Sequence, residues 1–187
     1  MGLGRTLGSF AVGLAVSPAL DYAWHAWIAH GRGSDPSRAA HLEHHRTAHT
    51  EGDAWAEIRE NRGRVARDAA IVAAVLAPLI GPSRSIPLAA GLGAAYVGIT
   101  LSHARMHVRG PRGAWEEWMW RFHFHHHYVD SKVNFGLTSP LFDYVFGTAV
   151  APCEVTIPEG SLPSWWDGER AGFRVRRARG ARAATVE

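Results

Sequence analysis

The sequence predicts an all-α protein, an integral membrane helical bundle with a histidine-rich metal site on one face. Two observations predict this class: three long stretches carry no charged residue, and twelve of the 187 residues are histidine. The chain has one cysteine, Cys153, which excludes a disulfide framework and a metal cluster built on several thiolates. Any metal would therefore be held by imidazole, with or without carboxylate, a donor set that suits iron, zinc, copper or nickel.

The uncharged stretches are residues 7–20, with apolar character that continues to Ala29, then residues 69–83 and residues 85–102. As helices they would reach roughly 20 to 30 Å, against about 30 Å for the hydrocarbon core of a bilayer. Residues 81–87 hold a glycine and two prolines, which is the composition of a tight connection. The second and third stretches are therefore predicted to form a helical hairpin. A mean hydropathy of −0.13 leaves a soluble helical bundle as the alternative.

Arginine is distributed unevenly around these stretches. If the hairpin turn lies outside, the outer segments hold only Arg5 and Arg84, whereas residues 31–68 hold seven arginines and residues 170–182 hold six. This positive-inside asymmetry predicts a multi-pass membrane protein with its histidines at or near the cytoplasmic face. The net charge of +3 does not indicate a nucleic-acid partner, because nineteen of the twenty basic residues are arginine, an imbalance typical of genome composition.

The composition changes near residue 151, which predicts two regions. Residues 1–150 form the membrane-embedded domain, and residues 151–187, rich in proline, tryptophan and arginine, form a loosely ordered tail that associates with a surface. Before the tail, Trp115, Trp118 and Trp120 alternate with charged residues. This pattern is typical of a helix at the membrane–water interface, although tryptophans that fill a core give the same pattern.

Ten of the twelve histidines form four groups with regular spacing: H-x4-H, H-x2-H-H, H-x3-H and a second H-x2-H-H. These ten are His25, His30, His41, His44, His45, His103, His107, His123, His126 and His127. Positions i, i+3 and i+4 share one helix face, so each triplet is predicted to direct three imidazoles at one point. His25 and His30 would lie about 140° apart on an α-helix, which predicts that this pair straddles a helix end near Gly31.

Ten imidazoles exceed what one metal ion accepts. Two ions with about five nitrogens each would keep an open coordination position, as reactive sites do, so the ten histidines are predicted to be the metal ligands and catalytic residues of a dimetal site. His49 either joins the helix face of His45 or is solvated, and His125 points away from its neighbours and is left out. Asp21 lies four residues before His25 and either bonds that imidazole or reaches water at a helix end.

The four histidine groups are followed by residues 134–139 (NFGLTS) and residues 143–148 (DYVFGT). Together they resemble the fatty acid hydroxylase and sterol desaturase superfamily over about residues 10–150. The resemblance implies an integral-membrane, all-helical dimetal oxygenase that acts on a lipid chain or a sterol-like substrate. The pattern is most similar to fatty acid 2-hydroxylases, with carotenoid hydroxylases as the second possibility. Asp143, inside the similar segment, is favoured over Asp130 as a hydrogen-bond partner of the ligands.

The resulting hypothesis is an oxidoreductase in which two irons activate dioxygen to hydroxylate or desaturate a lipid. Zinc would satisfy the same imidazoles. The sequence has neither a P-loop nor a Rossmann-type glycine pattern, so electrons are expected from a separate reductase or redox carrier. The predicted partners are thus a lipid substrate, the membrane and an electron donor. The alternatives from other classes are a non-enzymatic membrane metal-binding protein and a soluble histidine-rich metal store.

Overall fold

The computed structural model describes residues 2–34, 36–47, 54–151 and 154–176, and this part of the chain is mainly helical, as predicted. It contains α-helices, one π-helix, a turn of 3-10 helix and two short strands. In chain order these elements are α1 (Leu3–Ala23), η1 (Trp24–Ala29), α2 (Pro36–Thr47), α3 (Ala54–Ile80), α4 (Pro82–Val108), α5 (Ala114–Tyr128), α6 (Leu141–Phe146), β1 (Val155–Pro158), η3 (Glu159–Ser161) and β2 (Phe173–Arg176).

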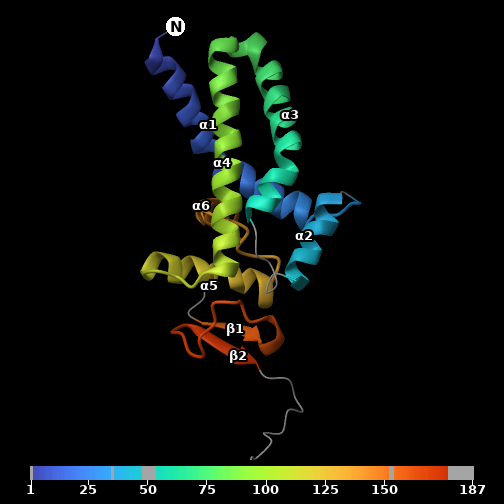
Figure 1. Ribbon diagram of the computed structural model, residues 1–187, viewed down its shortest axis with the longest axis vertical. Coiled ribbons are helices and arrows are strands. Elements are labelled where there is room, and N and C mark those ends of the chain that lie inside the picture. Colours follow the sequence, from blue (N-terminus) through green and yellow to red (C-terminus); the bar gives the residue numbers. More distant parts are fainter. Residues whose placement is uncertain (1, 35, 48–53, 152–153, 177–187) are drawn as a thin grey trace, which may run out of the picture.

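Helices α1, α3 and α4 run along the long axis of the molecule, with α4 packed against both of the others (Figure 1). Helices α1 and α4 cross at a pair of glycines. A Cβ atom on Gly91 would lie 2.3 Å from the carbonyl oxygen of Phe10, and one on Gly13 would lie 2.2 Å from that of Leu88. Small residues therefore let the two backbones touch, as is common where helices associate in lipid.

Within the part of the chain that the structure describes, two helical segments are long and apolar enough to cross a bilayer. They are Leu3–Ala29, which combines α1 with η1, and Pro82–Val108, which is α4. The remaining predicted stretch lies in α3, whose first half is rich in charged residues. The uncharged part of this helix is therefore limited to residues 69–80, which is roughly 18 Å long. The length and composition of a spanning helix are thus found for the first and third predicted stretches, and not for the second.

The connection between α3 and α4 is shorter than predicted. Helix α3 ends at Ile80 and α4 begins at Pro82, so Gly81 alone turns the chain, with a φ angle of 81°. Glycine adopts this left-handed conformation at little cost. Proline suits the first turn of a helix, where its missing N–H has no partner to lose. Residues 82–87, which were predicted to be part of the connection, lie in α4, with Pro87 inside the helix.

Residues 154–176 form a small folded unit against α5, so the prediction of a loosely ordered tail is wrong for these residues. Strands β1 and β2 pair in parallel, with Val155 opposite Phe173. Their inward side chains share one buried cluster with side chains of α4 and α5: Val155, Ile157, Phe173, Met106, Met119, Trp120 and Phe124. Strands of four residues in a region rich in proline and glycine give little periodicity to detect. Residues 177–187, the rest of the predicted tail, lie outside the described residues.

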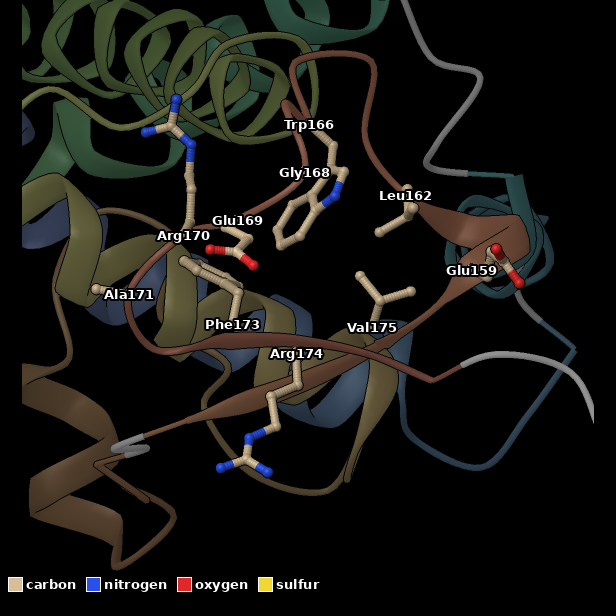
Figure 2. Close-up of a pocket in the computed structure, with 10 residues that line it drawn as sticks. All are labelled: Glu159, Leu162, Trp166, Gly168, Glu169, Arg170, Ala171, Phe173, Arg174 and Val175. Carbon is tan, nitrogen blue, oxygen red and sulfur yellow. The ribbon is translucent and has the colours of Figure 1, made fainter. Parts of the chain in front are cut away.

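A hollow of about 760 Å³ opens on this C-terminal unit (Figure 2). Apolar side chains such as Trp166 and Phe173 line it together with charged ones such as Glu169 and Arg174. The described residues that line it include none of the ten grouped histidines. The hollow is therefore separate from the predicted metal site.

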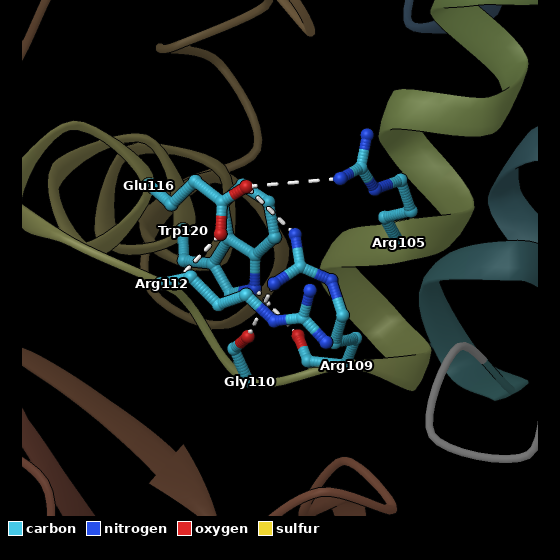
Figure 3. A network of polar contacts seen from close by, with 6 residues as sticks. All are labelled: Arg105, Arg109, Gly110, Arg112, Glu116 and Trp120. Carbon is cyan, nitrogen blue, oxygen red and sulfur yellow. Dashed lines mark hydrogen bonds and ion pairs between the residues drawn. The ribbon is translucent and has the colours of Figure 1, made fainter.

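An ion pair joins the end of α4 to the start of α5. Glu116 accepts hydrogen bonds from the Arg109 guanidinium at 2.7 Å and from the backbone N–H of Arg112 at 2.6 Å (Figure 3). The indole N–H of Trp120 donates to the Arg109 carbonyl oxygen at 2.9 Å. The bond from Arg109 is the main cause that lowers the pKa of Glu116 below its ordinary value. These contacts hold together two helices that carry five of the ten predicted ligands.

Candidate metal centre

The structure gathers the ten grouped histidines into two sets of five. Within each set, the ligand nitrogens all lie within 4.8 Å of one another. The first set, here named the η1 cluster, consists of His25, His30, His41, His45 and His126. The second set, here named the α4 cluster, consists of His44, His103, His107, His123 and His127. Both clusters lie where the ends of η1, α2, α4 and α5 converge.

Each H-x2-H-H triplet divides between the clusters, whereas its spacing predicted three imidazoles at one point. In α2, His41 and His45 belong to the η1 cluster and His44 belongs to the α4 cluster. The triplet of α5 divides in the same way, with its middle member, His126, alone in the η1 cluster. Residues i and i+4 differ by about 40° around a helix, but residues i+3 and i+4 differ by about 100°. A triplet therefore faces two directions and contributes to two sites.

His25 and His30 meet because the chain between them is a π-helix. The N–H of His30 donates to the carbonyl oxygen of His25 at 3.0 Å, which is the five-residue hydrogen bond of this helix type. The wider turn brings the two imidazoles together, with ring centroids 5.2 Å apart. The helix ends at Ala29 with His30 as its C-cap, so the predicted helix end near Gly31 is confirmed. A Cβ atom on Gly31 would lie 1.8 Å from the Trp27 carbonyl oxygen.

Two imidazoles of the η1 cluster donate a hydrogen bond from the outer ring N–H to a backbone carbonyl oxygen. The Nδ1 atom of His25 lies 2.5 Å from the carbonyl oxygen of Phe135, and Nδ1 of His126 lies 2.7 Å from that of Val133. A carbonyl oxygen only accepts, so each Nδ1 carries the hydrogen and each Nε2 presents a lone pair to the cluster. Imidazoles that bind metal ions are oriented in this way.

The loop that supplies these carbonyls is itself held by buried polar side chains. The carboxylate of Asp143 accepts hydrogen bonds from the Phe135 N–H at 2.7 Å and from the Thr148 hydroxyl at 2.8 Å. Asn134 adopts a left-handed conformation, with φ of 59°, and its amide donates to two backbone carbonyls. Asp143 also accepts the N–H of Gly136 at 2.8 Å, in the same peptide group as the Phe135 carbonyl to which His25 donates. The predicted direct bond from Asp143 to an imidazole is thus replaced by an indirect one.

The other singled-out residues that the structure describes lie outside both clusters. Asp21 is buried and accepts a hydrogen bond from the Leu137 N–H at 3.1 Å, so it supports the same loop and not an imidazole. Asp130 is exposed and accepts a hydrogen bond within its own turn. His125 belongs to neither cluster, as expected. His49 lies outside the described residues.

The sequence did not single out Phe135 as a functional residue. Its ring centroid lies 5.6 Å from that of His25, 5.7 Å from that of His30 and 5.4 Å from that of His126. The ring therefore covers one side of the η1 cluster. The only signal in the sequence was the NFGLTS stretch, which contains Phe135 but gives no position for its side chain.

Burial favours the neutral form of several of the clustered imidazoles. It lowers the pKa of His126 and of His127 well below the ordinary value of 6.5. It also lowers the pKa of His30 to about 4, with a smaller contribution from the charge of Arg38, and that of His45 to about 3. Neutral imidazoles keep the lone pair that a metal ion requires.

The nitrogen positions fit a metal ion in each cluster. The Nε2 atoms of His30 and His41 are 2.9 Å apart, and those of His107 and His123 are 3.0 Å apart. Two nitrogens bound at right angles, each about 2.1 Å from a metal ion, lie about 3 Å apart. Lone pairs that face each other at this distance in a buried site are unfavourable unless a cation lies between them.

The two clusters are in direct contact. His45 of the η1 cluster stacks on His127 of the α4 cluster, with ring centroids 4.2 Å apart and an interplanar angle of 16°. His44 and His45 are neighbours in sequence and contribute to different clusters. The arrangement therefore suits two neighbouring ions held by imidazole, the ligand of iron, zinc and copper sites.

Comparison with known proteins places this site in a family. The model of the fatty acid hydroxylase family matches residues 10–148, which include all ten clustered histidines. A solved structure described as full-length Scs7p, with only the hydroxylase domain visible, is similar in fold, with a TM-score of 0.60 and 21% identity over 83% of this chain and 60% of that one. This chain thus spans less than two thirds of that protein. No curated protein sequence matches the present chain. The chain belongs to the fatty acid hydroxylase family.

Proposed function

We propose that this protein is a multi-pass membrane oxidoreductase that uses two metal ions, dioxygen and external electrons to hydroxylate an unactivated C–H bond of a lipid acyl chain. The observation that carries the proposal is the pair of touching five-histidine clusters beside two apolar helices. Family membership favours hydroxylation over desaturation, and an acyl chain over a sterol-like substrate or a carotenoid.

Iron is the metal that we expect in both clusters. Dioxygen activation needs a metal that changes oxidation state, and zinc, which fits the same imidazoles, has no redox chemistry. When bound, the two ions would supply the activation of dioxygen. The ten histidines would hold them, each through one ring nitrogen.

The protein's own side chains would orient the ligands and exclude water. The carbonyls of residues 133 and 135 hold His126 and His25 with their Nε2 atoms facing inward. The ring of Phe135, which is 5% exposed, covers the same imidazoles on one side. A dry, preorganised site of this kind protects a reactive centre from side reactions.

The electrons would come from another protein. Hydroxylation of one C–H bond consumes one dioxygen, two electrons and two protons, and it releases one water. The sequence lacks the glycine patterns of nucleotide-binding domains, so we expect a separate reductase or redox carrier. The excess of arginine in residues 31–68 and 170–182 supports a cytoplasmic position for both clusters.

The test is lipid profiling by mass spectrometry of cells with and without the gene, together with two variants that each remove one ligand. His44→Ala affects the α4 cluster and His126→Ala affects the η1 cluster. We expect an acyl chain with one added oxygen in cells that carry the wild-type gene, and its loss in both variants. The control is His125→Ala, which changes a neighbouring imidazole of α5 outside both clusters and should keep the product.

Each other outcome contradicts part of the proposal. Hydroxylation that survives in either ligand variant would exclude the clusters as the active site. A product that has lost two hydrogens would identify a desaturase. Metal binding without any change in the lipids would favour the non-enzymatic metal-binding protein.

A further inference from the structure

Helix α6 presents apolar side chains on its exposed side. Leu141, Tyr144, Val145 and Phe146 are 55%, 58%, 64% and 51% exposed. The helix has one charged residue, Asp143, and that carboxylate is fully buried in the loop network. The exposed side of α6 therefore carries no charge at all, which is unusual for a helix that faces water.

This side of α6 continues onto the end of the first candidate membrane span. Trp27 is 62% exposed, and its ring centroid lies 5.8 Å from that of Phe146. Phe146 also stacks on the buried Tyr22 of α1, at 5.0 Å. About two helical turns before Trp27 along the chain, Leu20 is exposed as well. Trp27, Leu141, Tyr144, Val145 and Phe146, here named the α6 surface, thus extend the apolar exterior of α1.

We propose that the α6 surface lies in the bilayer, at the boundary between the head groups and the acyl chains. Its partner is lipid, because the surface is continuous with a helix that is apolar and long enough to cross the membrane. Tryptophan and tyrosine are enriched at this depth, where an apolar ring meets a polar edge. A short helix with one apolar side lies in the plane of the interface in the same manner.

The proposal deepens the proposed function, on which this step rests, because the α6 surface leads to the η1 cluster. Tyr22, which stacks on Phe146, makes an edge contact with Phe135 at 5.8 Å. Phe135 in turn covers His25 and His126. A row of aromatic rings therefore joins the lipid-facing surface to the histidines. An acyl chain that leaves the bilayer beside α6 would approach the η1 cluster along these rings.

Site-specific fluorescence in proteoliposomes tests the membrane position without any need for turnover. In the full chain with Cys153→Ser, Val145→Cys carries an environment-sensitive fluorophore, and Leu141→Cys serves as a second labelled position. Glu159→Cys, an exposed position on the C-terminal unit, is the matched control. The protein is reconstituted in phosphatidylcholine vesicles, and emission is quenched either by a lipid with a nitroxide on its acyl chain or by iodide in the water.

We expect the nitroxide lipid to quench the label at residue 145 or 141 several-fold more than the label at residue 159, and iodide to show the opposite order. Equal quenching by iodide at all three positions would overturn the proposal. Because the measurement needs no reaction, a label in the bilayer without any hydroxylated product would sink the proposed function and leave the α6 surface intact. Product formation with labels that are exposed to water would support the proposed function and overturn the proposal for the α6 surface.

Discussion

Two backbone carbonyls decide which nitrogen of His25 and His126 faces the η1 cluster. Each carbonyl oxygen requires the hydrogen on Nδ1, so each Nε2 keeps a lone pair that can bind a metal ion. The strength of this orientation depends on the loop that carries the carbonyls. Asp143 holds that loop by accepting the backbone N–H of Phe135, and it is therefore a positioning residue for the cluster.

Asp143→Asn tests this role. The new amide can accept at only one of its two positions, so the Phe135 peptide loses part of its support and the affinity of the η1 cluster for metal should fall. Loss of such an outer hydrogen bond typically lowers metal affinity by about 10- to 100-fold. Equilibrium dialysis with Fe²⁺ under anaerobic conditions would measure the change. Asp130→Asn, in an exposed turn of the same loop, is the control, and equal affinities in the two variants would contradict the role.

At this scale, the spacing of the histidines predicted which ten residues come together, but not how they divide. The i to i+4 rule correctly paired His103 with His107. The division of each triplet depends on where the neighbouring helices place the other histidines of each cluster, which is a tertiary property. The histidine spacing also did not predict the π-helix between His25 and His30. The spacing shows that an α-helix would separate the two side chains, but it does not show which irregularity brings them together.

Among the elements, the crossing of α1 and α4 positions the two candidate spans. The crossing is close because Gly13 and Gly91 have no side chain to separate the backbones. Helix α1 leads into η1, and α4 carries His103 and His107. The crossing therefore also helps to fix the position of the η1 cluster relative to the α4 cluster.

Gly91→Ala should loosen this crossing. The added methyl group would overlap the Phe10 carbonyl, and overpacking of this kind costs about 1 to 3 kcal/mol. We expect a lower thermal unfolding midpoint in detergent. Gly98→Ala is the matched control on the same helix, because a Cβ atom there meets nothing within 4 Å, and alanine favours a helix over glycine. A midpoint that is the same in both variants would show that the glycine contact is unimportant.

The long helices were predictable because charge-free stretches of this length have few alternatives. The ends of these helices were less predictable, because Gly81 alone makes the turn and α3 is helical far into its charged half. Short elements such as α6 and the two strands have too few residues for a period to show, and their positions follow from buried contacts such as that of Asp143 with the loop.

For the whole molecule, the C-terminal unit braces α5, the helix that carries three of the clustered histidines. Phe124 of α5 lies between the C-terminal unit and the α4 cluster. Its ring centroid is 6.1 Å from that of Phe173 and 5.6 Å from that of His107. The unit thus packs against α5 beside the α4 cluster, although the sequence predicted no stable structure there.

Phe173→Ala should weaken this brace. Removal of a buried phenylalanine side chain costs about 3 to 5 kcal/mol, so we expect a clear fall in the unfolding midpoint and a lower metal content in the α4 cluster. The neighbouring Arg174→Ala changes an exposed side chain and should have little effect. Wild-type stability in Phe173→Ala would mean that the C-terminal unit does not support the helical part.

The number of metal ions per chain tests the central claim most directly. Purified protein would be loaded anaerobically with Fe²⁺, freed of excess metal and analysed by mass spectrometry for iron and by amino-acid analysis for protein. The account predicts two ions per chain in the wild type and the loss of at least one in His41→Ala, which affects the η1 cluster, and in His107→Ala, which affects the α4 cluster. One ion or none in the loaded wild type, or two in both variants, would contradict a dimetal site built from these ten histidines.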